Sequence, residues 1–261
     1  MRAKKSLGQN WLNSAAIRSK IIKAAKLGTK DAVLEIGPGR GFLTGALLKQ
    51  AGKVVAVEKD DRLISFLNNR FSGAVETGKL VVIHGDIVDQ ALKGKYKVVA
   101  NIPYYLTGQI LRQLLTAVQQ PELVVLMLQQ EVAERIATTA RRGARTKVKE
   151  SLLSLSVKVF GQPRLVARVA ARHFTPRSKV DSAILLIDEI SRDRLATKGE
   201  EERFFTLLKK GFAHKRKLLA SNLNVSTDVL ESCKIEPKAR AEELTLEQWL
   251  CLTNFINTQA K

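Results

Sequence analysis

Short runs of apolar, often β-branched residues recur through the first half of the chain, separated by segments with helical spacing. The near-continuous apolar runs are residues 32–36, 53–57, 79–83, 97–100 and 123–127. Such runs suit strands that are buried on both faces of a parallel sheet. Between them, residues 42–50 and 63–71 carry apolar positions at the spacing of an amphipathic helix. This alternation predicts a doubly wound, Rossmann-like α/β domain, in which ligands bind at the carboxyl ends of the strands.

The second half of the chain has a different pattern. A helix through Ile136 leads to a basic loop at 140–147, and residues 182–187 predict one further strand. After that strand only helical spacing remains, in residues 200–212, 214–223, 228–234 and 246–256. We therefore expect an α/β domain over residues 1–189 and a small all-helical domain over residues 190–261.

The charge of the chain points to a polyanionic partner. There are 44 Lys and Arg residues against 25 Asp and Glu, a net charge of +19, and the excess is spread along the whole chain. Neutralisation of phosphates by such a surface supplies much of the affinity for nucleic acid, although charge alone does not distinguish DNA from RNA. The alternative is a generically basic protein that lives among polyanions. The longest apolar run, 123–128, is far shorter than the roughly 20 residues of a membrane span, so we expect no membrane association.

The cysteines and the N-terminus bear on the compartment. Cys233 and Cys251 lie in apolar, helix-like stretches and form neither a metal-ligand cluster nor a disulfide framework, so we expect buried thiols in a reducing compartment. The N-terminus lacks the apolar core of a signal peptide. It has no acidic residue before Asp31 and so superficially resembles an organellar transit peptide, but we expect a cytoplasmic protein.

A glycine-rich turn follows the first predicted strand. Gly37, Gly39 and Gly41 let the backbone turn sharply and approach a ligand without a Cβ in the way. Their G-x-G-x-G spacing differs from the dinucleotide pattern, so no pyrophosphate site is required. Glu58, at the end of the second strand, can accept hydrogen bonds from ribose hydroxyls, and Asp86, after the third, from an adenine amine. Any strand-to-helix turn can use glycine, but the three strand ends together predict a pocket for an adenosine cofactor.

The fourth predicted strand ends in Asn101-Ile102-Pro103-Tyr104. An adenine amine is a poor nucleophile because its lone pair is delocalised into the ring. The side-chain oxygen of Asn101 and a backbone carbonyl near Ile102 can hold the amine hydrogens and favour a pyramidal, more nucleophilic nitrogen. Pro103 stiffens the turn, and Tyr104 offers a ring on which an extruded base can stack. Alignment with a sulfonium methyl group supplies the rate through proximity, and this chemistry needs no metal.

Together these motifs resemble the ribosomal RNA adenine dimethyltransferases (the KsgA family), relatives of the Erm resistance methyltransferases. The resemblance runs in order along nearly the whole chain. It covers residues 5–12, the glycine turn, Glu58, residues 85–87, 101–104, 173–176, 179–182, 212–217 and 240–244. It implies a methyltransferase domain that binds S-adenosylmethionine, with residues 5–12 folded over the cofactor, and a helical domain that docks on rRNA.

The resemblance also implies roles for individual residues. The expected cofactor contacts are Gln9, Asn10, Leu12, Gly37, Gly39, Gly41, Glu58, Lys59, Asp86, Ile87 and Asn101. The expected residues at the target adenine are Asn101, Ile102, Pro103, Tyr104 and Phe174. By composition alone, an ordinary core aromatic is the commoner reading of Phe174. Family substrates are two adjacent adenosines in the hairpin near the 3′ end of small-subunit rRNA, each methylated twice, so we expect the assembling small subunit as partner of a monomeric enzyme.

Five positions depart from the family pattern. Trp11 stands where phenylalanine is usual, and Ser178 replaces a proline, which predicts a less rigid loop around Phe174. Glu150-Ser151 occupies the place of a Tyr-Gly pair, and Lys158 that of a glutamine. None of these positions belongs to the predicted catalytic set.

Three other functions remain open at this point. The same chemistry could act on large-subunit rRNA, although residues 212–223 look more like the small-subunit enzymes. DNA adenine methylation is disfavoured because those enzymes usually begin the catalytic motif with aspartate instead of Asn101. A non-catalytic assembly or transcription factor is disfavoured by the intact cofactor residues. The basic run 214–217 is interpreted as an rRNA phosphate contact, with a solvated helix face as the alternative, and the loop 140–147 is either a surface turn or an RNA-facing loop.

Overall fold

The computed structural model describes residues 8–86, 92–138 and 149–259. Contacts divide the chain into two compact units, the first made of residues 1–134 and 162–190 and the second of residues 135–161 and 191–261. The chain passes from the first unit to the second for the last time between residues 190 and 191, which is where the sequence predicts a domain boundary. Residues 135–161, which the sequence assigns to the α/β domain, group instead with the second unit. The backbone shows why: the Glu150 amide donates to the Glu242 carbonyl at 2.7 Å, and the Ser191 amide to the Phe160 carbonyl at 2.8 Å.

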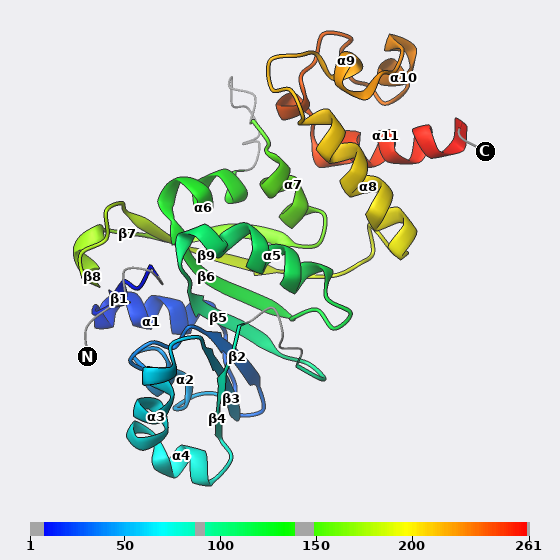
Figure 1. The fold of residues 1–261 in the computed structure, drawn as a ribbon. Coiled ribbons are helices and arrows are strands. Elements are labelled where there is room, and N and C mark those ends of the chain that lie inside the picture. Colours follow the sequence, from blue (N-terminus) through cyan, green and yellow to red (C-terminus); the bar gives the residue numbers. More distant parts are fainter. Residues whose placement is uncertain (1–7, 87–91, 139–148, 260–261) are drawn as a thin grey trace. The chain divides into compact units, whose positions relative to one another are not determined.

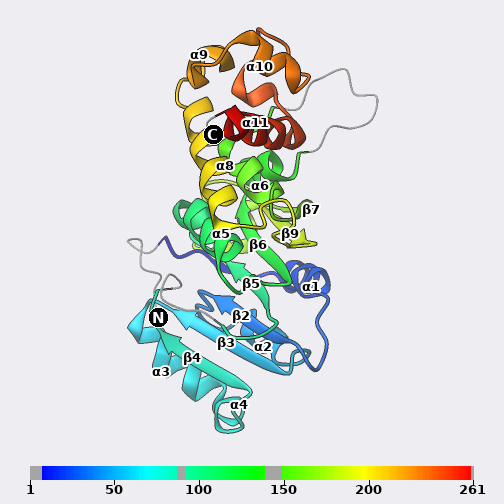
Figure 2. The same ribbon diagram turned by 90° about the vertical axis from the view of Figure 1, so that its right-hand side faces the viewer.

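A seven-stranded sheet forms the centre of the first unit, with the strand order β4-β3-β2-β5-β6-β9-β7 (Figure 1). Its parallel strands are β2 (Ala32–Ile36), β3 (Lys53–Glu58), β4 (Leu80–His84), β5 (Lys97–Asn101) and β6 (Leu123–Gln129). The last two strands, β9 (Ser182–Asp188) and β7 (Gln162–Val169), are antiparallel. Figure 2 shows β4, β3, β2, β5 and β6 following one another across the unit. The predicted α/β fold class is confirmed.

Helices form where the sequence combines an apolar stripe with a cap. The Ser14 side chain accepts from the Ile17 amide at the start of α1 (Ala15–Ala24), and Asp60 caps α3 (Asp61–Arg70) in the same way. The buried residues of α1 and α2 (Thr44–Leu47) join those of the strands in one core cluster. The other helical elements described in this unit are α4 (Ser72–Glu76), η3 (Tyr104–Leu106), α5 (Thr107–Thr116) and η4 (Ala171–His173). α6 (Gln130–Ala137) runs from the first unit into the second.

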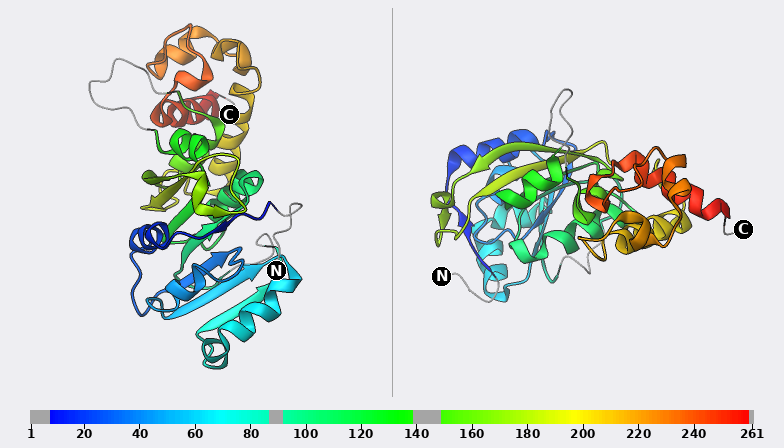
Figure 3. Two further views of the ribbon diagram at one scale, coloured as in Figure 1. Left: turned by 90° about the vertical axis from the view of Figure 1, so that its left-hand side faces the viewer. Right: turned by 90° about the horizontal axis from the view of Figure 1, so that it is seen from above.

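Two short strands that the sequence does not predict lie beside the sheet. β1 (Trp11–Leu12) pairs antiparallel with β8 (Phe174–Thr175), with Leu12 opposite Phe174 and Trp11 opposite Thr175. The segment containing β1 crosses the carboxyl ends of the central strands before it enters α1 (Figure 3, left). An N-terminal segment of the chain is therefore held against the edge of the sheet where ligands bind in this fold.

The second unit is helical. Its elements are α7 (Leu152–Lys158), α8 (Lys198–Gly211), α9 (Leu219–Leu223), α10 (Thr227–Ser232), η5 (Ala241–Glu243) and α11 (Leu246–Gln259). Thr197 and Glu200 form a reciprocal capping box at the start of α8. The fully buried Trp249 of α11 stacks on Phe212 with ring centroids 5.7 Å apart. The predicted helical C-terminal region is thus present, although α9 covers only half of the segment 214–223.

The cysteine expectation is wrong. Cys233, which follows α10, and Cys251, in α11, are joined in a disulfide 18 residues apart in sequence. The sequence predicts buried thiols, but two helices that pack together bring the cysteines to a Cα–Cα distance of 5.7 Å, within the range of a bridge. In the described part of the chain, none of the helices has the length and apolar character needed to cross a membrane.

Candidate active site

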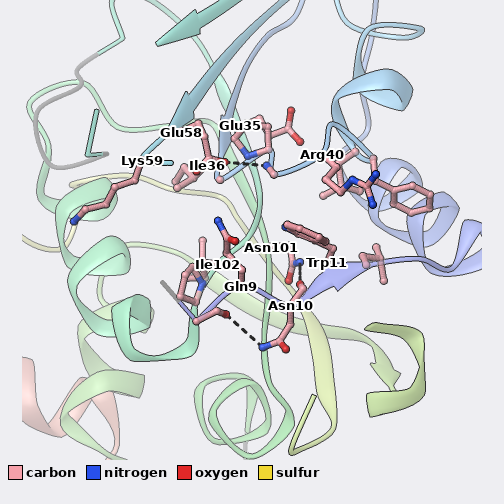
Figure 4. Close-up of a pocket in the computed structure, with 18 of the residues that line it drawn as sticks. Gln9, Asn10, Trp11, Glu35, Ile36, Arg40, Glu58, Lys59, Asn101 and Ile102 are labelled. Atoms are coloured by element: carbon pink, nitrogen blue, oxygen red, sulfur yellow. Dashed lines mark hydrogen bonds between the residues drawn. The ribbon is translucent and has the colours of Figure 1, made fainter. Parts of the chain in front are cut away.

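A cavity of about 800 Å³ opens at the carboxyl ends of β2, β3 and β5 in the first unit (Figure 4). Most of the predicted site residues line it: Gln9, Asn10, Leu12, Gly37, Gly39, Glu58, Lys59, Asp86, Asn101, Ile102, Pro103 and Tyr104. They come from five segments that are far apart in sequence. The doubly wound topology explains this convergence, because parallel strands end at the same edge of the sheet.

The glycine turn forms one wall of this cavity. Gly37, Gly39 and Gly41 have φ angles of +65°, +56° and +77°, a region that side chains rarely adopt. A Cβ on Gly39 would lie 3.1 Å from Cδ1 of Trp11, so the turn is shaped to admit the indole ring. A Cβ on Gly41 would lie 2.5 Å from Cε2 of Phe71, and Gly41 does not line the cavity. The structure therefore places Gly41 in packing contacts with Phe71, away from the predicted ligand.

Glu58 fixes the end of β3 against this turn. Its Oε2 accepts from the Gly39 amide at 3.0 Å and its Oε1 from the Asp60 amide at 2.9 Å. Burial raises the pKa of the Glu58 carboxyl above its usual range, while these backbone donors oppose the shift. Because a backbone N–H binds each oxygen, the carboxylate is held in one orientation. Its remaining lone pairs are free to accept hydrogen bonds from two neighbouring hydroxyl groups of a ligand.

The N-terminal segment is anchored across the cavity at several points. Gln9 Nε2 donates to Asp60 Oδ2 at 3.0 Å, and Asn101 Nδ2 donates to the Asn10 carbonyl oxygen at 3.1 Å. Asp60 is itself buried and paired with Arg62, whose Nη2 lies 2.7 Å from Asp60 Oδ2. The hydrogen bond from Asn101 Nδ2 to Asn10 fixes the orientation of the Asn101 side-chain amide. The Oδ1 atom of Asn101 is then left as an acceptor within the site.

Asp86 and Lys59 meet at the mouth of the cavity. Lys59 Nζ lies 2.9 Å from Asp86 Oδ2, and this ion pair raises the pKa of Lys59. The Lys59 side chain is exposed to solvent and can swing away from the pair at little cost. Ile87, the next predicted contact, lies outside the described residues, as do residues 5–7 of the N-terminal motif and the basic loop 140–147.

Phe174 is placed differently from the other predicted residues. Phe174 is only 3% exposed, belongs to the hydrophobic core cluster and stands opposite Leu12 in the β1–β8 pair. The cavity is lined instead by the two residues that follow it, Thr175 and Pro176. The structure thus does not bring the Phe174 ring to Asn101 and Tyr104, and its contact with a target base stays a prediction.

Three lining residues escape the sequence analysis or are underrated by it. Glu35, the last residue but one of β2, is 1% exposed, and burial is the main reason that its pKa rises to about 8. Thr44 lies close enough to oppose part of this shift, but no described residue makes a hydrogen bond of ordinary geometry to either carboxylate oxygen or to the indole N–H of Trp11. Tyr105 is 66% exposed at the rim. Glu35 stands two positions before Gly37, and an acidic residue so close to a glycine turn is a sequence signal that could have identified it.

The sheet order, the glycine turn, the buried Glu58 and the Asn101–Tyr104 turn together define an S-adenosylmethionine-dependent methyltransferase. More narrowly, the chain belongs to the ribosomal RNA adenine dimethylase family, whose model matches residues 1–258. The predicted family is therefore confirmed, and so is the prediction of an enzyme that transfers methyl groups.

Comparison with known proteins gives the same family along the full length. The chain is 41% identical to ribosomal RNA small subunit methyltransferase A of Dehalococcoides mccartyi, over 98% of this chain and 90% of the relative. It is 36% identical to the protein of the same name from a Nostoc species, over 99% and 100%. Among solved structures, a dimethyladenosine transferase from Plasmodium falciparum superposes with a TM-score of 0.80 at 28% identity, covering 95% and 98% of the two chains. The 23S rRNA methyltransferase ErmE gives 0.74 at 25% identity, covering 95% and 100%.

Proposed function

We propose that this protein dimethylates N6 of two adjacent adenosines in the hairpin near the 3′ end of small-subunit rRNA. The observation that carries this proposal is the orientation of Asn101. Its amide nitrogen is held by the Asn10 carbonyl, which leaves Oδ1 in the cavity as an acceptor for an N–H of the target amine. The relatives named small subunit methyltransferase A support the choice of subunit.

The residues present fit S-adenosylmethionine as methyl donor. The cavity has room for a nucleoside with an amino-acid arm, and its glycine turn offers backbone at close range. Glu58 would hold the ribose hydroxyls, Asp86 the adenine amine, and Gln9, Asn10 and Leu12 would cover the ligand from the N-terminal segment. The bound cofactor supplies an electrophilic methyl group on a positively charged sulfur. No described residue needs to act as a nucleophile toward that group.

The chain's own contribution to the reaction is to hold the adenine amine. Asn101 Oδ1 and the carbonyl of Ile102 or its neighbour accept its two hydrogens and favour a pyramidal nitrogen with an available lone pair. Pro103, with φ −58°, fixes the turn that follows β5, and the Tyr104 ring supports the extruded base. Fixing the amine in one orientation supplies rate through proximity, because a misplacement of about 1 Å costs on the order of 100-fold.

The rRNA partner follows from charge and family together. A net charge of +19 favours phosphate contacts, and we assign docking on the assembling small subunit to the helical region after residue 190, with basic residues such as Lys215 and Lys217 at the surface. We propose that the enzyme works as a monomer in the cytoplasm. Target choice would then depend on the shape of the particle and on unstacking of the target base.

The similarity to ErmE makes large-subunit rRNA the second candidate substrate. The test supplies methyl-labelled S-adenosylmethionine with unmodified small subunits, large subunits or duplex DNA, followed by mass spectrometry of the nucleosides. Dimethyladenosine confined to small-subunit RNA is the expected result. Label in large-subunit RNA or DNA would keep the chemistry and overturn the target, and absence of cofactor binding would overturn the assigned site.

A further inference from the structure

The hydroxyl group of Tyr104 belongs to a row of three side-chain hydroxyls beside the cavity. Its oxygen lies 2.8 Å from Ser182 Oγ and 3.1 Å from Ser178 Oγ. Ser182 begins β9 and is fully buried, and Ser178 is 6% exposed in the loop that precedes it. The row therefore connects the turn after β5 to a segment 74 to 78 residues further along the chain.

The direction of each hydrogen bond follows from the number of protons available. Ser178 Oγ donates to the carbonyl oxygen of Val180 at 2.8 Å, which uses the only proton of that hydroxyl. Ser178 must then accept from the Tyr104 hydroxyl, and Ser182 must donate to the Tyr104 oxygen. Each hydroxyl donates once, and the row ends on a backbone carbonyl. Bonds in such a row polarise and strengthen one another in a low-dielectric site.

This arrangement decides what Tyr104 presents to the cavity. Its phenol proton is committed to Ser178, so the residue offers a ring face and no acidic group. The loop that carries Ser178 is also fixed at its far end, because Asp181 Oδ1 accepts from the Ala171 amide at 2.9 Å. The ring of Tyr104 is thus held by two hydroxyls that are themselves held by β9 and by the loop backbone.

We propose that Ser178 and Ser182 are positioning residues for methyl transfer, because they hold the Tyr104 ring in the plane on which the target base stacks. This role rests on the proposed function, which takes Tyr104 as the support of the extruded base. Since transfer depends steeply on the orientation of the amine, loss of either hydroxyl should slow the chemical step more than it weakens binding of the RNA or the cofactor.

The test is a double-mutant cycle between Ser178 and Tyr104. Single-turnover transfer is measured for Ser178→Ala, Tyr104→Phe and the double variant, with cofactor affinity by calorimetry and small-subunit binding by filter retention. We expect Ser178→Ala to lower the transfer rate roughly 10-fold with both affinities unchanged, and Ser178→Thr, which keeps a hydroxyl, to restore most of it. In the Tyr104→Phe background, Ser178→Ala should have no further effect. Ser182→Ala, in the same cycle, should behave as Ser178→Ala does.

A hydroxyl outside this row provides the matched control. Ser156→Ala removes a hydroxyl that also donates to a backbone carbonyl, that of Leu152 at 2.6 Å in α7, and should leave the transfer rate unchanged. Two results would show that Ser178 does not act through Tyr104. One is a transfer rate in Ser178→Ala equal to that of the wild type. The other is a loss of rate on adding Ser178→Ala to Tyr104→Phe that is as large as the loss it causes in the wild type. Absence of transfer by the wild-type protein on every RNA would instead overturn the proposed function, and this role with it.

Discussion

The amide nitrogen of Asn101 donates a hydrogen bond of 3.1 Å to the carbonyl oxygen of Asn10. This bond connects the end of β5 to the N-terminal segment that crosses the cavity, so the orientation of the predicted catalytic side chain depends on whether that segment is in place. The same segment is fastened at Gln9 to Asp60 and through β1 to β8. The position of this segment across the cavity and the orientation of the Asn101 side chain are therefore coupled.

Replacement of Asn101 tests that relationship. Asn101→Ala removes the acceptor for the target amine and should lower methyl transfer at least ~100-fold, while binding to the small subunit stays largely intact. Asn101→Asp keeps an acceptor but loses the donor to Asn10, and its charge faces a carbonyl oxygen, so it should be similarly impaired. Single-turnover transfer and particle binding measured in parallel check both variants. An equal loss of binding and transfer would count against the assigned role.

Glu58 allows a separate test of the cofactor site. Hydrogen bonds to a charged group contribute about 1.5–3 kcal/mol, so Glu58→Ala should weaken S-adenosylmethionine binding roughly 10- to 100-fold. Part of the loss comes from the turn itself, because the Gly39 and Asp60 amides lose their acceptor. Titration calorimetry gives the affinity, and Glu76→Ala, on the exposed surface of α4, is the matched control. Unchanged affinity would remove Glu58 from the pocket.

Glu35 should make the stability of the protein depend on pH. Burial raises its pKa from 4.5 to about 8, so the folded protein holds a proton that the unfolded chain releases. The stabilisation is fully present below pH 4.5 and is lost as the pH rises toward 8, at up to about 1.4 kcal/mol per pH unit. Glu35→Gln stays neutral, so its free energy of unfolding should exceed that of the wild type increasingly between pH 6 and pH 8. Urea denaturation of both proteins at the two pH values measures this difference, and a constant difference would show that Glu35 does not titrate in that range.

The fold and much of the site were predictable because their signals are local in sequence. Each parallel strand is a short apolar run, and Gly37, Glu58, Asp86 and Asn101 stand at or just after the ends of such runs, so topology alone brings them together. β7 gave no such signal: it lies at the sheet edge with most of its residues exposed, and its register shifts between Leu165 and Ala167. An edge strand of this kind lacks the apolar run that marks a buried one.

Other features depend on tertiary contacts that no local pattern encodes. The Phe174 ring fits the sequence pattern of a base-binding aromatic, yet its pairing with Leu12 buries it in the core. The raised pKa of Glu35 is a property of the surrounding atoms. Likewise, the Cys233–Cys251 pairing requires α10 and α11 to pack together, which spacing alone does not reveal.

The disulfide can be tested directly. Denatured protein prepared without reductant should show no free thiols, whereas the expectation of reduced core cysteines would give two. A bridge across 18 residues stabilises a fold by about 3 kcal/mol in the chain-entropy account, so reduction should lower the free energy of unfolding of the helical unit by roughly that amount. The double variant Cys233→Ser/Cys251→Ser should match the reduced wild type. Two reactive thiols in protein purified without reductant would show that the bond does not form.

Two departures from the family pattern prove to be partners. Lys158 Nζ lies 2.5 Å from Glu150 Oε1, both side chains are 12% exposed, and Ser154 Oγ donates to the other oxygen of Glu150 at 2.7 Å. Lys158→Gln alone would restore the family residue but leave a largely buried carboxylate without its cation, which should cost about 3 kcal/mol. Lys158→Gln with Glu150→Gln removes both charges and should recover most of that loss. Urea denaturation of the two variants gives the comparison, and equal stability of the single variant and the wild type would mean that the pair is not coupled.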